Sequence, residues 1–159
     1  MVRRRCPSAG CCWGRTHEPG AIDHPAPASI RISTDSWTEP YWEAAKKERL
    51  VAPRCAQCGA FRFPPTPFCP ECRSQDVDWV TLSGRGSVFS YSVVRGLPGM
   101  ADLLLVPVVV ELPDAPGVHL VTNIVDVDPE DVRVEMPLEV DFVEIADGWK
   151  LPVFRPAGH

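Results

Sequence analysis

Two C-x-x-C pairs lie close together near the middle of the chain, and they constrain the fold more than any other feature. Cys55 and Cys58 form the first pair, and Cys69 and Cys72 form the second after ten intervening residues. Each pair can present two thiolates from one tight turn, and two such turns complete a tetrahedral Cys₄ shell of the kind that Zn²⁺ favours. The spacing therefore predicts a structural zinc ribbon over residues 55–78.

Cysteines at this spacing have two other known uses in proteins. A redox C-x-x-C is disfavoured, because two pairs stand at ribbon spacing and no β-α-β pattern adjoins them. Iron in a rubredoxin-like site uses the same four ligands, so the sequence leaves zinc and iron open, with zinc as the default. Gly59 follows Cys58, where a residue that tolerates positive φ eases the turn. The segment "GAFRFPPTPF" between the pairs is expected to form a two-stranded ribbon.

The first 33 residues differ in composition from the rest and are expected to be a disordered tail. They are rich in Pro, Gly, Ala, Arg and Cys, without helical or strand periodicity. A second metal site there is disfavoured, because the spacing of its Cys and His residues fits no ligand template. Those residues are Cys6, Cys11, Cys12, His17 and His24. No apolar run is long enough to cross a bilayer, and no secretory signal is evident, so we expect a cytoplasmic protein without a membrane partner.

A short helix is predicted in the N-terminal segment, residues 34–54. Thr38 is a plausible N-cap, Pro40 suits the first turn, and "YWEAAKKERL" reads as helix to about Arg49. Tyr41 and Trp42 are two aromatic residues on so short a helix that they require a partner surface. That surface is either the rest of this chain or another subunit.

From Trp79 onward the chain consists of short β-rich segments separated by turns. The segments are "DWVTL", "GSVFSYSVV", "LLLVPVVVEL", "GVHLVTNIVDV", "LEVDFVEI" and "WKLPVF". About five strands of this size, with one helical turn at "DPED" between the third and fourth, predict a five-stranded OB-fold barrel over residues 79–156. An immunoglobulin-like sandwich ranks second, because it needs about seven strands. Residues 157–159 are expected to be a C-terminal tail. The predicted class is thus mostly β, with an N-terminal helix, a zinc ribbon and a barrel.

Catalytic and nucleic-acid-binding signals are weak in this chain. Nucleophile-elbow, P-loop and dinucleotide-binding motifs do not occur, and His119 alone among the histidines lies within the predicted ordered body. The formal net charge is −5, and the barrel strands carry Glu and Asp where a strand-tracking groove needs basic and aromatic residues. We therefore expect a non-catalytic binding or scaffolding protein. A zinc-ribbon and OB-fold nucleic-acid-binding module is the alternative.

The order of features resembles a family of acyl-CoA-associated proteins that join a rubredoxin-like zinc ribbon to an OB-fold, long filed as a domain of unknown function. The resemblance covers about residues 33–156. It rests on "PYWEAAKKERLVAPRCAQCGAFRFPP", "CPECRS", "VTLSGRGSVFSYSVV", "VPVVVEL", "TNIVDVDPEDVRVEMPLEV" and "LPVFRP". One departure is Glu135 in "VEMP", where the family pattern has a glycine.

The resemblance implies an accessory subunit rather than an independent enzyme. Such proteins pair with thiolase-superfamily enzymes or hydratases and help to hold or channel an acyl-CoA, in some cases during steroid side-chain degradation. By this likeness Tyr41 and Trp42 would supply partner or pantetheine contacts in a hetero-oligomer. The CoA phosphates would need cations, and Arg62, Arg85 and Arg95 are the candidates.

Overall fold

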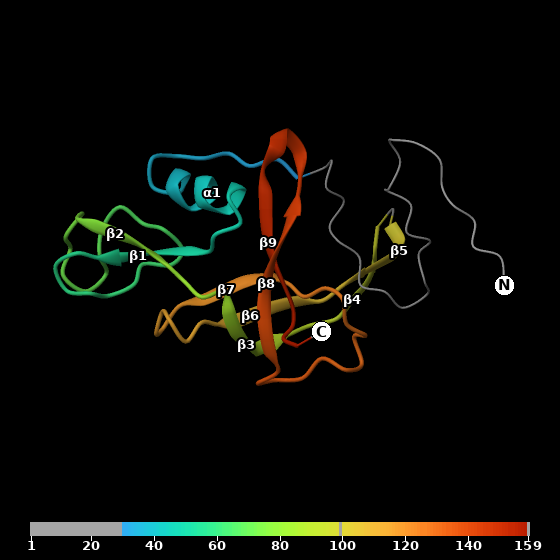
Figure 1. Cartoon of the computed structure of the whole chain (residues 1–159). Helices are drawn as coiled ribbons and strands as arrows, with labels where there is room; N and C mark the ends of the chain where they lie inside the picture. The colour runs from blue at the N-terminus through green and yellow to red at the C-terminus, as the bar shows by residue number, and fades with distance from the viewer. Residues whose placement is uncertain (1–29, 99, 159) are drawn as a thin grey trace.

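The computed structural model describes residues 30–98 and 100–158 and has the mostly β architecture that the sequence predicts (Figure 1). Residues 1–29 of the expected tail, with its cysteines and histidines at 6, 11, 12, 17 and 24, lie outside the described residues. Residues 30–33 are described, and the Arg31 guanidinium lies 3.6 Å from the Asp147 carboxylate. In chain order the elements are α1 (Glu39–Lys46), β1 (Val51–Cys55), β2 (Val77–Thr81), β3 (Arg85–Tyr91), β4 (Val94–Leu97), β5 (Met100–Leu105), β6 (Pro107–Glu111), β7 (His119–Asn123), β8 (Pro137–Glu144), the 3₁₀ turn η2 (Ala146–Gly148) and β9 (Lys150–Pro156). Within the described residues, no helix has the length and apolarity needed to span a bilayer.

The barrel is a single curled sheet of five strands in the order β7-β6-β3-β8-β9. All neighbours in that order are antiparallel. The two end strands approach each other at a parallel bridge between Ile124 and Phe154, which partly closes the sheet into an OB-like half-barrel. One sheet curling toward its own edge excludes the immunoglobulin-like sandwich, which packs two separate sheets face to face. The apolar run "LLLVPVVVEL" is divided at Val106 between β5 and β6.

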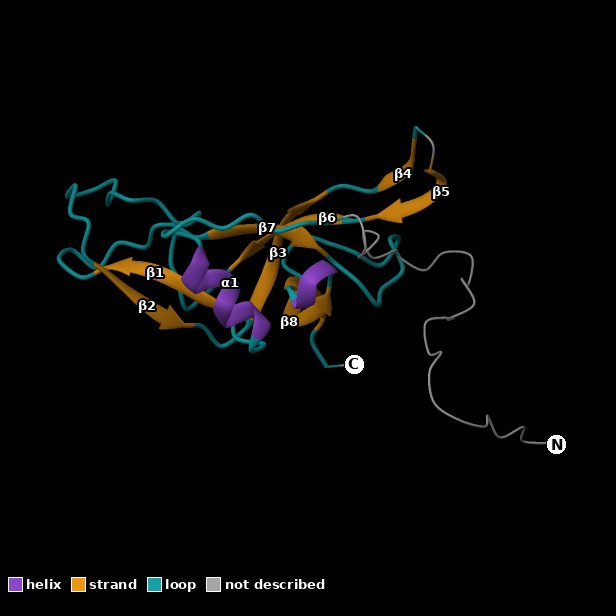
Figure 2. Cartoon of the chain, turned by 90° about the horizontal axis from the view of Figure 1, so that it is seen from above, coloured by secondary structure: helices purple, strands orange, loops and turns teal. Residues whose placement is uncertain are grey.

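The β4–β5 hairpin forms a separate two-stranded sheet. It lies at the end of the molecule opposite the β1–β2 sheet, as both views show (Figures 1 and 2). The barrel is therefore flanked by a small sheet at each end.

The ribbon sheet is formed by different residues from those expected. β1 and β2 pair antiparallel from Val51↔Thr81 to Cys55↔Val77, so its strands lie outside the two C-x-x-C turns. Between the turns, "GAFRFPPTPF" contributes only a single bridge from Phe61 to Arg54. Three prolines in that stretch lack the N–H that a ladder requires, which explains why it does not form a hairpin. The boundary expected at residues 78 and 79 falls within β2.

One continuous core joins the helix, the ribbon sheet and the barrel. It includes Tyr41 and Ala44 from α1, Val51 and Ala52 from β1, and Phe154 among the residues from the barrel. Phe154 and Ala52 are completely buried. Because these residues pack together, the ribbon and the barrel do not have separate cores.

The start of α1 has the predicted N-cap residue but not the expected side-chain hydrogen bond. Thr38 occupies the N-cap position but makes no capping hydrogen bond with its side chain. The Asp35 carboxylate instead accepts hydrogen bonds from the N–H groups of Trp37 and Thr38, at 2.9 and 2.8 Å, and from the Thr38 hydroxyl at 2.9 Å. Pro40 has no N–H to offer a cap at the second helical position, so the Thr38 hydroxyl turns back to Asp35.

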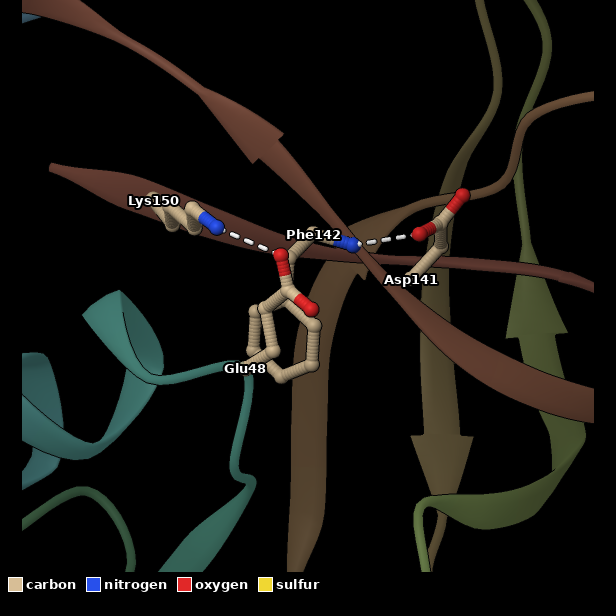
Figure 3. Close-up of polar contacts among 4 residues, drawn as sticks. All are labelled: Glu48, Asp141, Phe142 and Lys150. Atoms are coloured by element: carbon tan, nitrogen blue, oxygen red, sulfur yellow. Dashed lines mark hydrogen bonds and ion pairs between the residues drawn. The ribbon is translucent and has the colours of Figure 1, made fainter. Parts of the chain in front are cut away.

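The helix ends at Lys46, three residues before the predicted end, in a Schellman arrangement. The N–H of Glu48 donates to the Ala45 carbonyl at 2.9 Å, and the N–H of Arg49 donates to the Ala44 carbonyl at 3.0 Å. Glu48 has φ of 55°, the left-handed conformation that usually selects glycine at this position. Its carboxylate pairs with Lys150 of β9, which ties the helix end to the barrel (Figure 3).

The loop between β7 and β8 contains the predicted "DPED" turn and the residue that departs from the family pattern. The Asp128 carboxylate accepts a hydrogen bond from the Glu130 N–H at 2.9 Å, and the Asp131 N–H donates to the Asp128 carbonyl at 2.9 Å. The segment makes a turn rather than the expected helical turn. Glu135 has φ of 66°, so the backbone adopts here the conformation for which glycine is best suited.

Gly86 on β3 provides a test of barrel packing. A Cβ at this position would lie 2.4 Å from Val110 Cγ1 and 2.9 Å from the Glu111 carbonyl oxygen. Gly86→Ala should therefore lower the free energy of unfolding by about 1–3 kcal/mol through overpacking. Urea denaturation measures the change. Ser90→Ala on the exposed part of the same strand is the control and should stay within about 0.5 kcal/mol of the unsubstituted chain.

The pH dependence of stability tests the role of Asp35 at the helix start. Hydrogen bonds from the Thr38 N–H and hydroxyl lower the pKa of Asp35 below its ordinary value of 3.8. A lowered folded-state pKa contributes stability that is present above the unfolded pKa and is lost as the pH falls through the folded one. Asp35→Ala should therefore lower the melting temperature at pH 7, and the difference from the unsubstituted chain should shrink in strong acid. An equal difference at both pH values would contradict this assignment.

Candidate metal centre and apolar groove

The four cysteines of the two C-x-x-C pairs converge in space. Their Sγ atoms all lie within 4.8 Å of one another, and the Cys55–Cys72 and Cys58–Cys69 pairs are 3.5 Å apart. A tetrahedron with metal–sulfur bonds of about 2.3 Å has sulfur–sulfur edges of roughly 3.8 Å. Four thiol donors at these distances fit a four-coordinate metal ion with no position left open.

Each pair is held by the same backbone geometry. The N–H of Gly59 donates to the Cys55 carbonyl at 2.9 Å, and the N–H of Arg73 donates to the Cys69 carbonyl at 3.0 Å. Gly59 has φ of 77°, as the sequence predicts, and Arg73 has φ of 65° at the matching position of the second turn. The two turns are thus a structural repeat in which arginine occupies the position of the glycine.

The pKa values of the thiols are shifted in opposite directions within the cluster. The Cys58 N–H hydrogen-bonds to the Cys55 thiol and lowers its pKa to about 6, and the Cys72 N–H lowers that of Cys69. For Cys58 the Ala60 N–H acts in the same direction, but contact with the Cys69 thiol and burial outweigh it, and the pKa rises to about 12. Four adjacent thiols therefore cannot all ionise by themselves, and a bound cation would provide the opposing charge.

Arg62 lies beneath the ribbon loop and is 2% exposed. Its guanidinium donates to the Pro67 carbonyl at 3.3 Å and also to the Asp76 carbonyl. These bonds join the two ends of the loop that carries the second cysteine pair. Arg62 is thus engaged inside the ribbon, whereas Arg85 on β3 and Arg95 on β4 are exposed. The structure does not bring the three arginines together in one site.

A groove with a volume of about 450 Å³ lies where the helix, the ribbon loop and the barrel meet. α1 contributes Tyr41 and Trp42, and the loop after Arg62 contributes Phe63. The Tyr41 ring lies edge-on to both, with centroids 5.1 Å from Trp42 and 5.6 Å from Phe63. The remaining lining residues are Thr38, Pro64, Pro65, Leu120, Val121, Thr122, Asn123, Leu151 and Pro152.

Within this chain, Tyr41 and Trp42 have the partner surface that the short helix requires. Tyr41 is buried in the shared core, and both rings also line the groove. The sequence gives no sign of the other walls, because Phe63, Val121 and Pro152 are distant along the chain and belong to three different elements. The aromatic pair on the short helix was the only feature of the sequence that indicated a binding surface here.

The outer face of the barrel sheet carries exposed apolar side chains next to this groove. Phe89 is 52% exposed and Val121 is 73% exposed, and Val121 also lines the groove. The His119 ring lies against Phe89 with the two centroids 4.4 Å apart. Exposed apolar surface of this kind is a feature of protein interaction sites.

Family comparisons match most of the described chain. The ChsH2 rubredoxin-like zinc ribbon domain matches residues 42–78, and the ChsH2 C-terminal OB-fold domain matches residues 79–143. Among solved structures, the Ltp2-ChsH2(DUF35) aldolase superposes with a TM-score of 0.73 and 41% identity, over 80% of this chain and 99% of that one. A DUF35 protein of unknown function from Sulfolobus solfataricus has the same fold, with a TM-score of 0.57 at 15% identity.

Curated relatives fall into two kinds. A probable enoyl-CoA hydratase alpha subunit from Thermomonospora curvata is 44% identical over 118 residues, which are 74% of this chain but 36% of that protein. The 3-oxo-4,17-pregnadiene-20-carboxyl-CoA hydratase alpha subunit of Mycobacterium tuberculosis is 31% identical over 81% of this chain and 40% of its own length. A DUF35 domain-containing scaffold protein from Methanocaldococcus jannaschii is 36% identical over 64% of this chain and 74% of its own. The chain therefore spans well under half of the two hydratase subunits.

Metal content provides a test of the cysteine cluster. Cys55→Ser with Cys58→Ser should remove the bound metal and unfold the ribbon, because a Cys₄ site supplies on the order of 10–16 kcal/mol of apparent binding free energy. Elemental analysis and thermal melting measure the two effects. Replacing Cys6, Cys11 and Cys12 together with Ser is the matched control and should leave one metal per chain. Retention of metal and of a normal melting curve by the first variant would refute the assignment.

Proposed function

The chain belongs to the family in which a ChsH2 rubredoxin-like zinc ribbon is joined to a ChsH2 C-terminal OB-fold, and on that basis we propose that it is a non-catalytic accessory subunit. In this role it binds a thiolase-superfamily enzyme or a hydratase and helps to hold or channel an acyl-CoA substrate. The chain and its partner form a hetero-oligomer in which the partner carries the catalytic groups.

The observation that carries this proposal is the likeness to the Ltp2-ChsH2(DUF35) aldolase. That match covers 99% of the matched chain at 41% identity, so the likeness extends over almost the whole of that chain. The archaeal relatives described as scaffold proteins support the same role. The alpha subunits of hydratases support a second kind of partner, but each of them is longer than this chain.

The surface next to the groove supports a protein partner. Phe89 and Val121 are exposed on the outer face of the barrel sheet, and Trp42 is half-buried at the groove. Aromatic residues in contact with a largely apolar surface are typical anchors of protein interfaces.

We assign zinc as the resident metal of the Cys₄ cluster. Cys55, Cys58, Cys69 and Cys72 would hold it, and with four sulfur ligands the ion has no free position for substrate. When bound, the ion supplies the charge that keeps all four thiols ionised. Its role is to fix the ribbon loop, which forms one wall of the groove.

The proposed substrate class is an acyl-CoA, with a steroid side chain among the candidate acyl groups. The Mycobacterium tuberculosis relative, named for a pregnadiene-carboxyl-CoA, supports the steroid candidate. Arg85 and Arg95 are the two exposed cations proposed for contact with the CoA phosphates. Arg62 is not included, because its guanidinium is engaged with backbone carbonyls inside the ribbon.

Co-purification tests the proposal. The tagged full chain, expressed in its native cells, should retain a thiolase-superfamily or hydratase enzyme at a fixed stoichiometry. Adding the chain to that enzyme should raise its turnover of acyl-CoA, and the chain alone should show no turnover. In the same assay, Arg85→Ala with Arg95→Ala should raise KM for the acyl-CoA, since charge-assisted contacts to phosphate would be lost.

Arg49→Ala with Arg133→Ala removes two exposed arginines outside both candidate positions and serves as the control for net charge. Acyl-CoA turnover by the chain alone would contradict the non-catalytic role. Salt-sensitive binding of single-stranded nucleic acid without any enzyme partner would favour the nucleic-acid-binding alternative instead.

A further inference from the structure

Arg62 is the only charged side chain that is buried among those the structure describes. A guanidinium stays protonated throughout the pH range in which proteins are folded, so Arg62 cannot avoid its charge by losing a proton. A charge removed from water is costly unless an opposite charge accompanies it. The burial of Arg62 therefore requires a source of negative charge inside or next to the ribbon.

No carboxylate in the described part of the chain forms an ion pair with Arg62. Its two Nη atoms donate to backbone carbonyls, which carry no net charge, and its buried Nε has no hydrogen-bond partner among the described residues. The Asp76 carboxylate is exposed and accepts from the side chains of Gln57 and Ser74, at 3.1 and 3.3 Å. The negative charge that balances Arg62 must therefore come from another group.

The hydrogen bonds of Arg62 connect its guanidinium to the backbone of both cysteine pairs. The Asp76 carbonyl that it binds also accepts from the Ala56 N–H at 3.2 Å, and Ala56 follows Cys55 directly. The other carbonyl that it binds lies two residues before Cys69. Cys55 and Cys69 are the two buried members of the cluster. One cation thus holds the main chain beside each of the two buried sulfur ligands.

A metal bound by the four thiolates supplies charge of the opposite sign. A divalent ion with four thiolate ligands has a net charge of about −2, from the count of charges. Arg54 is next to Cys55 in the sequence and Arg73 is next to Cys72, but both arginines are exposed, and solvent screens their charges. Arg62 is buried, so its charge is screened much less.

We propose that Arg62 is the internal counter-ion of the Cys₄ metal centre, an inference that rests on the metal proposed above and on no property of the partner enzyme. The guanidinium stabilises the negative charge of the four ligands, and that charge in turn allows the guanidinium to be buried. Arg62 contributes no ligand. It acts through its charge and through the two carbonyls that position it beneath the loop.

The reduction potential of the iron-loaded full chain measures the charge effect. Iron is the probe because it accepts the same sulfur ligands and changes its charge by one unit between the ferrous and ferric states. Arg62→Gln removes the positive charge and keeps an amide donor. It should favour the ferric form roughly tenfold, which lowers the potential by about 59 mV for one electron. Spectroelectrochemical titration measures the shift.

Two variants separate the charge of Arg62 from its hydrogen bonds. Arg62→Lys keeps the charge but loses the planar fork of donors, so the ratio of ferrous to ferric affinity should stay within about twofold of the unsubstituted chain. Arg54→Gln removes an exposed charge next to Cys55, and it should also stay within about twofold because water already screens that charge.

Zinc affinity gives a second measurement that does not depend on redox chemistry. Competition with a chromophoric chelator should show that Arg62→Gln raises the dissociation constant for Zn²⁺ roughly 10- to 100-fold, the usual effect of losing a group that supports metal ligands. Arg62→Lys should raise it less than Arg62→Gln does, because only the lysine still opposes the charge of the thiolates.

Equal potentials for Arg62→Gln and Arg62→Lys would overturn the counter-ion role. Loss of metal by both variants alike would also overturn it, since the shape of the guanidinium rather than its charge would then be what the loop needs. Loss of metal by Arg62→Gln alone would support the role. An unsubstituted chain that bound neither iron nor zinc would refute the metal assignment itself, whereas co-purification of a partner enzyme tests the accessory role separately.

Discussion

The convergence of four thiols on one point is the constraint on which the rest of the structure depends. Between Cys55 and Cys72 the chain contains almost no regular structure, and its few buried groups include Cys55, Cys69 and Arg62. A loop of this kind cannot exclude enough apolar surface from water to hold its own shape. Coordination of a metal by the four thiols would replace that missing core, and the Arg62 guanidinium joins the loop ends from beneath.

The position of the loop then determines the surface available for binding. Phe63, Pro64 and Pro65 follow Arg62 directly and form the wall of the groove that faces α1. The helix is fixed in turn by burial of Tyr41 and Ala44 in the core shared with the barrel, and by the ion pair between Glu48 and Lys150. The groove is therefore bordered by three parts that pack on one core, although its residues come from distant parts of the chain.

The sequence predicted features whose causes are local. The C-x-x-C spacing, the positive φ of Gly59, the helix over Tyr41 and the five-stranded barrel each follow from residues close together in the chain. Thr38 is the N-cap residue as predicted, but its hydroxyl donates to the Asp35 carboxylate three residues upstream, a contact that the sequence pattern did not indicate. The ribbon strands were misplaced because the pairing of β1 with β2 spans the whole metal loop. The burial of Arg62 and the groove depend on contacts between distant segments, which no short sequence pattern encodes.

The parallel bridge between Ile124 and Phe154 closes the barrel where β7 meets β9, and Pro152 gives that closure an unusual chemistry. Proline has no N–H, so Pro152 cannot donate a main-chain hydrogen bond to β7. The Thr122 hydroxyl donates to the Pro152 carbonyl at 2.7 Å, so a side chain joins the two strands where one main-chain donor is missing. Closure at this point therefore depends on which residue stands at position 122, whereas a ladder made of main chain alone would accept many side chains there.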